Sequence, residues 1–220
     1  MPRTPLRMPK MSMTMKEGEL VGWKVAIGDA VTEDDWHHLW LSEGFATYLA
    51  ALWLGHVHGD SVFQAKMQHH AEAVFYQKGK DGVRVSNPVT ETPIVDTMAT
   101  DLMGLLNTNN YPKGAWVLHE LRGLVGDSAF FAGIRMYYSR FRNGVALSSD
   151  FQHAIEESSG QPLGWFFTQA LMLPGYPMLT VQWRPVGNTV ELEITQVQPP
   201  AWGLRQIPKL ELSVDGKLVT

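Results

Sequence analysis

One carboxylate stands out in the first half of the chain. Glu43 lies in the stretch WHHLWLSEGFATYL, which begins at Trp36 and is otherwise crowded with tryptophan, leucine and phenylalanine. The spacing of Phe45 and Leu49 predicts a helix that begins near Leu41, so Glu43 is expected in its first turn. A carboxylate at that position stabilises the positive end of the helix. If it is buried, it also needs a charge partner or a metal ion.

The other reactive residue types restrict the chemistry further. The chain has no cysteine, so a thiolate nucleophile is excluded and any metal must be bound by His, Asp or Glu. Adjacent histidines on a helix do not face one ion as i, i+4 pairs do. Neither a serine nucleophile elbow nor a glycine-rich phosphate loop is present. We expect solvated or stacked imidazoles at the candidate positions, which are His37, His38, His56, His58, His69 and His70.

The composition is that of a globular protein. The 220 residues are 45% hydrophobic and 18% charged, which excludes a disordered or fibrous chain. The formal net charge is −4, so we expect no nucleic acid partner. No apolar run is long enough to span a membrane, and the N-terminus lacks the pattern of a signal peptide. These features predict a soluble protein and favour a cytoplasmic location.

Three zones of the sequence differ in their periodicity. Residues 1–34 alternate short β-prone pieces with glycine turns, and residues 35–175 have helical spacing. Residues 176–220 switch to period two, which predicts three antiparallel strands. The fold class is therefore α+β. The expected helices are Leu41–Leu54 closed by Gly55, Asp60–Gln77, Lys113–Val125, Asp127–Tyr138 and one that begins at Ser149 or Asp150, with a loop over 78–110 that holds one helical turn near 101–106.

The stretch around Glu43 resembles the third-ligand helix of the aminopeptidase N family of zinc metallopeptidases, peptidase family M1. The family pattern is Leu-Trp-Leu-Asn-Glu-Gly-Phe-Ala, and Ser42 replaces the usual Asn here. The segment NYPKGAWVL, which begins at Asn110, is similar to the family's Tyr-x-Lys-Gly-Ala pattern. The similarity continues through PGYP at 174–177 into the strand region. The resemblance implies that Glu43 is a zinc ligand and that Tyr111 stabilises the oxyanion of the tetrahedral intermediate.

The same resemblance implies a domain plan and an activity. Residues 35–175 correspond to the helical, gluzincin-type C-terminal half of a peptidase domain, and residues 176–220 to part of a β-sandwich. Complete relatives hydrolyse N-terminal peptide bonds of peptide substrates with zinc. Their other two ligands and their general base come from a His-Glu-x-x-His helix, whose spacing falls on Leu20, Val21 and Lys24. We therefore expect no bound zinc and little or no activity in this chain.

Residues 1–34 have a resemblance of their own. The stretch RMPKMSMTMKEGELVGWKV, which begins at Arg7, and GDAV at 28–31 are similar to the opening of a lipoyl domain from 2-oxo acid dehydrogenase complexes. Those domains attach lipoate to a lysine in an Asp-Lys-Ala hairpin. This chain has no Asp-Lys-Ala, so we expect no lipoate.

Two further functions stay open at this stage. One is a non-catalytic module that binds peptides or a partner chain near Glu43 and Tyr111. The other is a truncated lipoyl carrier fragment. The strands over 176–220 also have apolar faces without cover, at Leu179 and Val181 for example. We therefore expect self-association through exposed strand edges.

Overall fold

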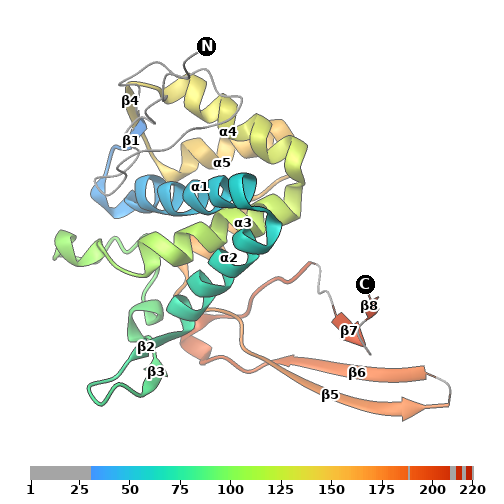
Figure 1. The fold of residues 1–220 in the computed structure, drawn as a ribbon. Coiled ribbons are helices and arrows are strands. Elements are labelled where there is room, and N and C mark those ends of the chain that lie inside the picture. The colour runs from blue at the N-terminus through green and yellow to red at the C-terminus, as the bar shows by residue number, and fades with distance from the viewer. Residues whose placement is uncertain (1–30, 188, 209–211, 215–216, 220) are drawn as a thin grey trace. The chain divides into compact units, whose positions relative to one another are not determined.

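The computed structural model describes residues 31–187, 189–208, 212–214 and 217–219 (Figure 1). They form two compact units, one that extends to Pro174 and one that starts at Gly175. The lipoyl-like segment, apart from its last four residues, lies outside the described residues. No helix in the described part of the chain is both long enough and apolar enough to cross a membrane.

The first unit is mainly helical. Its helices are α1 (Trp40–His58), α2 (Asp60–Phe75), α3 (Gly114–Val125), α4 (Asp127–Phe141), α5 (Ser148–Ser159) and the short α6 (Gly164–Phe167). Its strands are β1 (Val31–Glu33), which pairs in parallel with β4 (Gly144–Ala146), and β2 (Tyr76–Lys78), which pairs antiparallel with β3 (Arg84–Ser86). Helix α1 packs against both α2 and α3.

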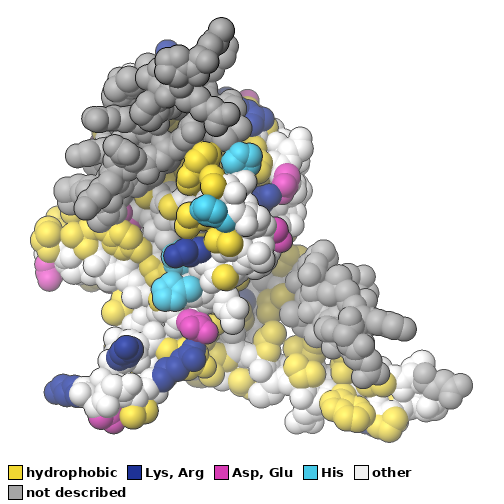
Figure 2. All heavy atoms as spheres, in the orientation of Figure 1, with side chains coloured by type: hydrophobic (Ala, Val, Ile, Leu, Met, Phe, Trp, Pro, Cys, Tyr) yellow, Lys and Arg dark blue, Asp and Glu magenta, His cyan; other side chains and the backbone are white. Residues whose placement is uncertain are grey.

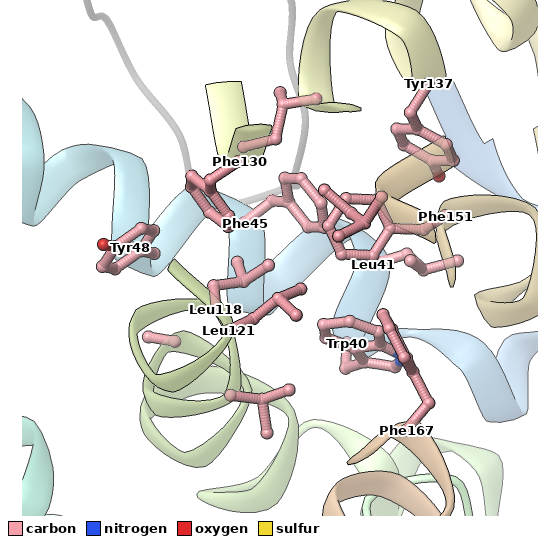
Figure 3. Packing of buried hydrophobic residues seen from close by; sticks show 14 of the residues in the cluster. Trp40, Leu41, Phe45, Tyr48, Leu118, Leu121, Phe130, Tyr137, Phe151 and Phe167 are labelled. Atoms are coloured by element: carbon pink, nitrogen blue, oxygen red, sulfur yellow. The ribbon is translucent and has the colours of Figure 1, made fainter. Parts of the chain in front are cut away.

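Aromatic side chains from several helices form the core of this unit (Figure 3). The Phe151 ring of α5 lies 4.9 Å from that of Phe45 in α1 and 5.3 Å from that of Tyr137 in α4, both edge to face. It also contacts the rings of Trp40 and Phe167 edge-on. Because Phe151 is fully buried and contacts four rings from the three helices α1, α4 and α6, it ties these helices into one core.

Several helix boundaries differ from the sequence-based expectation. Gly55 does not end α1, which continues to His58 and stops before Gly59, whose φ is +99°. Gly55 is needed for packing instead, because a Cβ there would lie 2.7 Å from the Cβ of Phe63 in α2. Helix α2 begins at Asp60 as expected, with Gly59 at its N-cap position and no side-chain hydrogen bond there, but it ends at Phe75 instead of Gln77. By contrast, Gly126 does end α3, with φ +82°.

The expected loop over 78–110 contains more structure than the sequence indicated. Its first part is the β2–β3 hairpin, with Gln77 opposite Val85. Two 3₁₀ turns follow, Pro88–Glu91 and Leu102–Leu105, and the second lies where one helical turn was expected. The prolines at positions 88 and 93 favoured the prediction of a loop here, because proline is rare inside strands.

The second unit is built from two hairpins. Strand β5 (Leu179–Val186) pairs antiparallel with β6 (Thr189–Gln196), and β7 (Leu212–Val214) pairs with β8 (Lys217–Val219). Val181 lies opposite Ile194, and Trp183 opposite Leu192, so one face of the β5–β6 hairpin is apolar. This face is exposed: the exposed fraction of Trp183 is 69%.

Candidate functional site

Glu43 lies in the first turn of α1 and is 2% exposed. Trp40, Leu41 and Phe45 on the same helix are buried as well, so the whole first turn and a half of α1 lies away from water. The preceding residue, Ser42, donates its hydroxyl hydrogen to the carboxylate of Glu33 in β1. The start of α1 is therefore attached to the β1–β4 pair as well as to the core.

Tyr111 lies in a single π-helical turn, Asn109–Lys113, that leads directly into α3. The Lys113 N–H donates to the carbonyl of Thr108, five residues back, at 3.0 Å. Pro112 inside the turn has no N–H to donate, so a regular α-helical ladder is interrupted there. Turns of this kind are common at functional sites, because the extra residue redirects one side chain.

Two buried asparagines hold this turn in place. The Nδ2 group of Asn109 donates to the carbonyl oxygens of Val89, at 2.9 Å, and Thr92, at 3.0 Å. The Nδ2 group of Asn110 donates to the Leu105 carbonyl at 2.8 Å. Sequence reasoning did not assign these roles, although two adjacent asparagines directly before the tyrosine were a visible signal.

Helices α1 and α3 approach most closely at two glycines. A Cβ on Gly44 would lie 3.0 Å from the backbone carbonyl carbon of Gly114, and a Cβ on Gly114 would lie 3.1 Å from the Gly44 Cα. Any side chain at either position would push the two backbones apart. This close approach brings Glu43, which precedes Gly44, together with Tyr111, which precedes Gly114 by three residues.

The two side chains interact directly. Burial, the negative charge of Glu43 and a hydrogen bond to its carboxylate together raise the pKa of Tyr111 to about 12. The phenol therefore stays protonated at neutral pH and donates a hydrogen bond. The structure thus brings together both residues that the sequence analysis singled out, in a site that has one buried carboxylate and one hydroxyl donor.

The segment before α1 attaches to the loop that leads to Tyr111. The indole Nε1 of Trp36 donates to the Leu102 carbonyl at 2.8 Å. The imidazole of His37 lies between Asp35, at 2.6 Å from Nδ1, and the Ala99 carbonyl, at 3.2 Å from Nε2. The hydrogen bond to Asp35 raises the pKa of His37. The expectation of a solvated or stacked imidazole is therefore wrong for His37, because both ring nitrogens have partners.

His38 is also a structural residue. Its Nδ1 lies 2.7 Å from the Ser148 hydroxyl, which accepts a hydrogen bond from the indole of Trp40 at 2.8 Å. Burial lowers the pKa of His38. The rings of His69 and His70 lie near each other, with centroids 6.1 Å apart, but they are tilted by 53° and not stacked.

The donor set around Glu43 does not fit a catalytic zinc ion. Such a site needs three protein ligands. Within the described residues, no three His, Asp or Glu side chains are grouped so that they could hold a metal ion. The sequence as a whole contains no His-Glu-x-x-His pattern, and residues 1–30 contain no histidine.

Comparison with known proteins identifies the family. The model of the peptidase family M1 domain matches residues 23–169, which is more than half of the chain. The chain belongs to peptidase family M1. Glutamyl aminopeptidase of Mus musculus is 32% identical over 157 residues, which cover 71% of this chain and 16% of that protein.

Solved structures of M1 peptidases share the fold. Aminopeptidase A of Legionella pneumophila, solved in complex with aspartic acid, matches with a TM-score of 0.59 and 22% identity, over 76% of this chain and 18% of that one. The M1 zinc metallopeptidase of Deinococcus radiodurans matches with a TM-score of 0.52 and 24% identity, over 66% and 30%. This chain therefore corresponds to a minor part of each relative's length, and its helical α+β fold is that of the family.

Proposed function

We propose that this chain is the part of an M1 aminopeptidase catalytic domain that carries the glutamate zinc-ligand position, Glu43, and the oxyanion-stabilising tyrosine, Tyr111. The contact between these two side chains is the observation that carries the proposal, because it joins two motifs 68 positions apart in the sequence. The domain plan follows: a helical, gluzincin-type half over 35–175, then part of a β-sandwich over 176–220.

The two residues have separable roles in this proposal. A protonated Tyr111 hydroxyl suits the stabilisation of negative charge that develops on a peptide carbonyl oxygen. The Glu43 position would supply one carboxylate oxygen to zinc where the other ligands are present. In a complete relative, zinc polarises the carbonyl and activates water. Because no other His, Asp or Glu among the described residues groups with Glu43 to hold a metal ion, we infer no hydrolytic step for the chain alone.

Metal analysis together with an activity assay tests this function. We expect freshly purified protein to contain far less than one zinc per chain and to hydrolyse alanine p-nitroanilide no faster than the Glu43→Gln variant does. Stoichiometric zinc with hydrolysis that a chelator abolishes would overturn the proposed inactivity. Glu157→Gln, a change on the exposed face of α5, is the matched control for loss of a carboxylate.

Metal-independent peptide binding is the second candidate. The neighbouring carboxylate and hydroxyl donor favour it, since they complement the α-ammonium and the carbonyl of a peptide N-terminus. Calorimetry with trialanine in the presence of a chelator should then detect heat that N-acetylated trialanine does not give. Tyr111→Phe should weaken that binding, whereas Tyr76→Phe in the exposed β2 strand should not. Equal heats for the two peptides would exclude this function.

A further inference from the structure

A concave site lies on the helical unit, away from Glu43. It is a cleft of about 490 Å³ between the C-terminal half of α1, the first turn of α2 and the C-terminal half of α3. Leu52 is the lining residue of α1 nearest in sequence to Glu43, and nine residues of helix separate them by about 13 Å along the axis. The volume is in the range of small-molecule sites.

Part of the cleft lining, Leu52, Phe63 and the ring of His119, is apolar or aromatic. Phe63 of α2 is 6% exposed, and Leu52 packs against the core. The imidazole of His119 in α3 lies edge to face with the rings of Phe63, at 5.4 Å, and Trp116, at 5.2 Å. Burial lowers the pKa of His119, so its ring is neutral at neutral pH. These residues therefore suit an aromatic or aliphatic group rather than an anion.

Of the Asp and Arg side chains that line the cleft, two form an ion pair with each other and the third lies apart from that pair. Arg122 donates from Nε and an Nη nitrogen to both carboxylate oxygens of Asp127, each at 2.8 Å, so these two charges neutralise one another. Asp60, in the first turn of α2, also lines the cleft and forms no salt bridge within the described residues. Two carboxylates and one guanidinium leave one net negative charge beside the apolar lining. Figure 2 shows histidine and hydrophobic side chains together over these helices.

We propose that the cleft between α1, α2 and α3 binds an ammonium group carried on an aromatic or aliphatic body. The ammonium pairs with Asp60, and the apolar body packs against Leu52 and Phe63. This site is independent of the aminopeptidase proposal, because it uses neither Glu43 nor Tyr111.

A series of three small probes tests the charge requirement. The full chain is titrated with 2-phenylethylamine, 2-phenylethanol and 3-phenylpropionate, and binding is followed by chemical shifts in two-dimensional NMR spectra. The amine should bind with a dissociation constant in the millimolar range, as expected for about nine non-hydrogen atoms. The alcohol should bind up to about fivefold more weakly, because an exposed ion pair contributes at most about 1 kcal/mol. Equal affinity of amine and alcohol, or tighter binding of the acid, would overturn the proposal.

Two variants test the location. Asp60→Asn should reduce amine affinity to that of the alcohol, whereas Asp101→Asn, on an exposed 3₁₀ turn, should leave it unchanged. Gly123→Leu should abolish binding, because the space beside Gly123 is open and the added side chain would enter the cleft. If the Gly123→Leu variant does not fold, as judged by circular dichroism, the probe series and Asp60→Asn still decide the matter. Unchanged amine binding in Asp60→Asn would refute the site.

Discussion

The helical unit and the β5–β6 hairpin use their apolar residues in opposite ways. In the helical unit, Phe45 and Phe151 are almost completely buried, because helices on several sides supply partner rings. In the hairpin, Val181 and Trp183 alternate just as regularly but are 52% and 69% exposed. Periodicity defines which side chains share a face, whereas burial depends on a partner surface. A hairpin of two strands adds little stability by itself, so we infer that the helical unit provides most of the stability of the described chain.

The largest expected effect contrasts one aromatic residue from each unit. Phe151→Ala should lower the free energy of unfolding by about 3–5 kcal/mol, because it leaves a cavity among the surrounding rings. Trp183→Ala should change it by less than about 0.5 kcal/mol, because its side chain is already in water. Urea denaturation followed by circular dichroism measures both. Phe151→Leu provides a milder variant if the alanine variant does not fold, and equal losses in the two units would refute the contrast.

A second comparison concerns two helical glycines. Gly44→Ala should cost about 1–3 kcal/mol, because the new Cβ meets the backbone of Gly114 and the helices α1 and α3 cannot move apart freely. Gly123→Ala, in open space on α3, should be neutral or stabilise the protein by up to about 1 kcal/mol, since alanine favours helix. The same urea assay compares them. Tolerance of alanine at both positions would mean that the close approach is not required for folding.

The hairpin also provides a test of self-association. An exposed apolar face and free strand edges favour pairing of copies, so we propose that Trp183→Lys weakens association by about fivefold, or about 1 kcal/mol, in sedimentation or light scattering. Gln182→Lys changes the neighbouring residue on the opposite, polar face and should have less effect. A monomer at all concentrations would show that the exposed face has no such role.

The smallest expected effect is the pH dependence of the His37 contact. The folded-state pKa of His37 is raised, so its contribution to stability is complete below the unfolded value of about 6.5 and is lost as the pH rises through the folded pKa. The Tm difference between the wild type and His37→Gln should therefore shrink from pH 6 to pH 9. A difference that grows with pH would contradict the proposed protonation. Thr32→Val, at the surface of β1, serves as a pH-independent control.

The sequence predicted features that depend on local pattern and missed those that depend on distant contacts. Helical spacing located α1 and α3. The motif resemblance singled out Glu43 and Tyr111, whose side chains lie in contact, and their zinc and oxyanion roles stay predictions. The partners of His37 and His38, by contrast, are 62 and 110 residues away, which no local pattern reveals. The role of Gly55 was missed for the same reason, because the Phe63 Cβ that leaves no room for a side chain at position 55 belongs to the next helix.

The π-helical turn Asn109–Lys113 contains one residue more than an α-helical turn would. This extra residue determines the direction of the Tyr111 side chain relative to the contact between Gly114 and Gly44. A regular helix rotates by about 100° per residue. If Pro112 were deleted while Gly114 stayed opposite Gly44, the phenol of Tyr111 would therefore point to another side of the helix. Contact between the Tyr111 hydroxyl and the Glu43 carboxylate therefore depends on the number of residues between Tyr111 and Gly114.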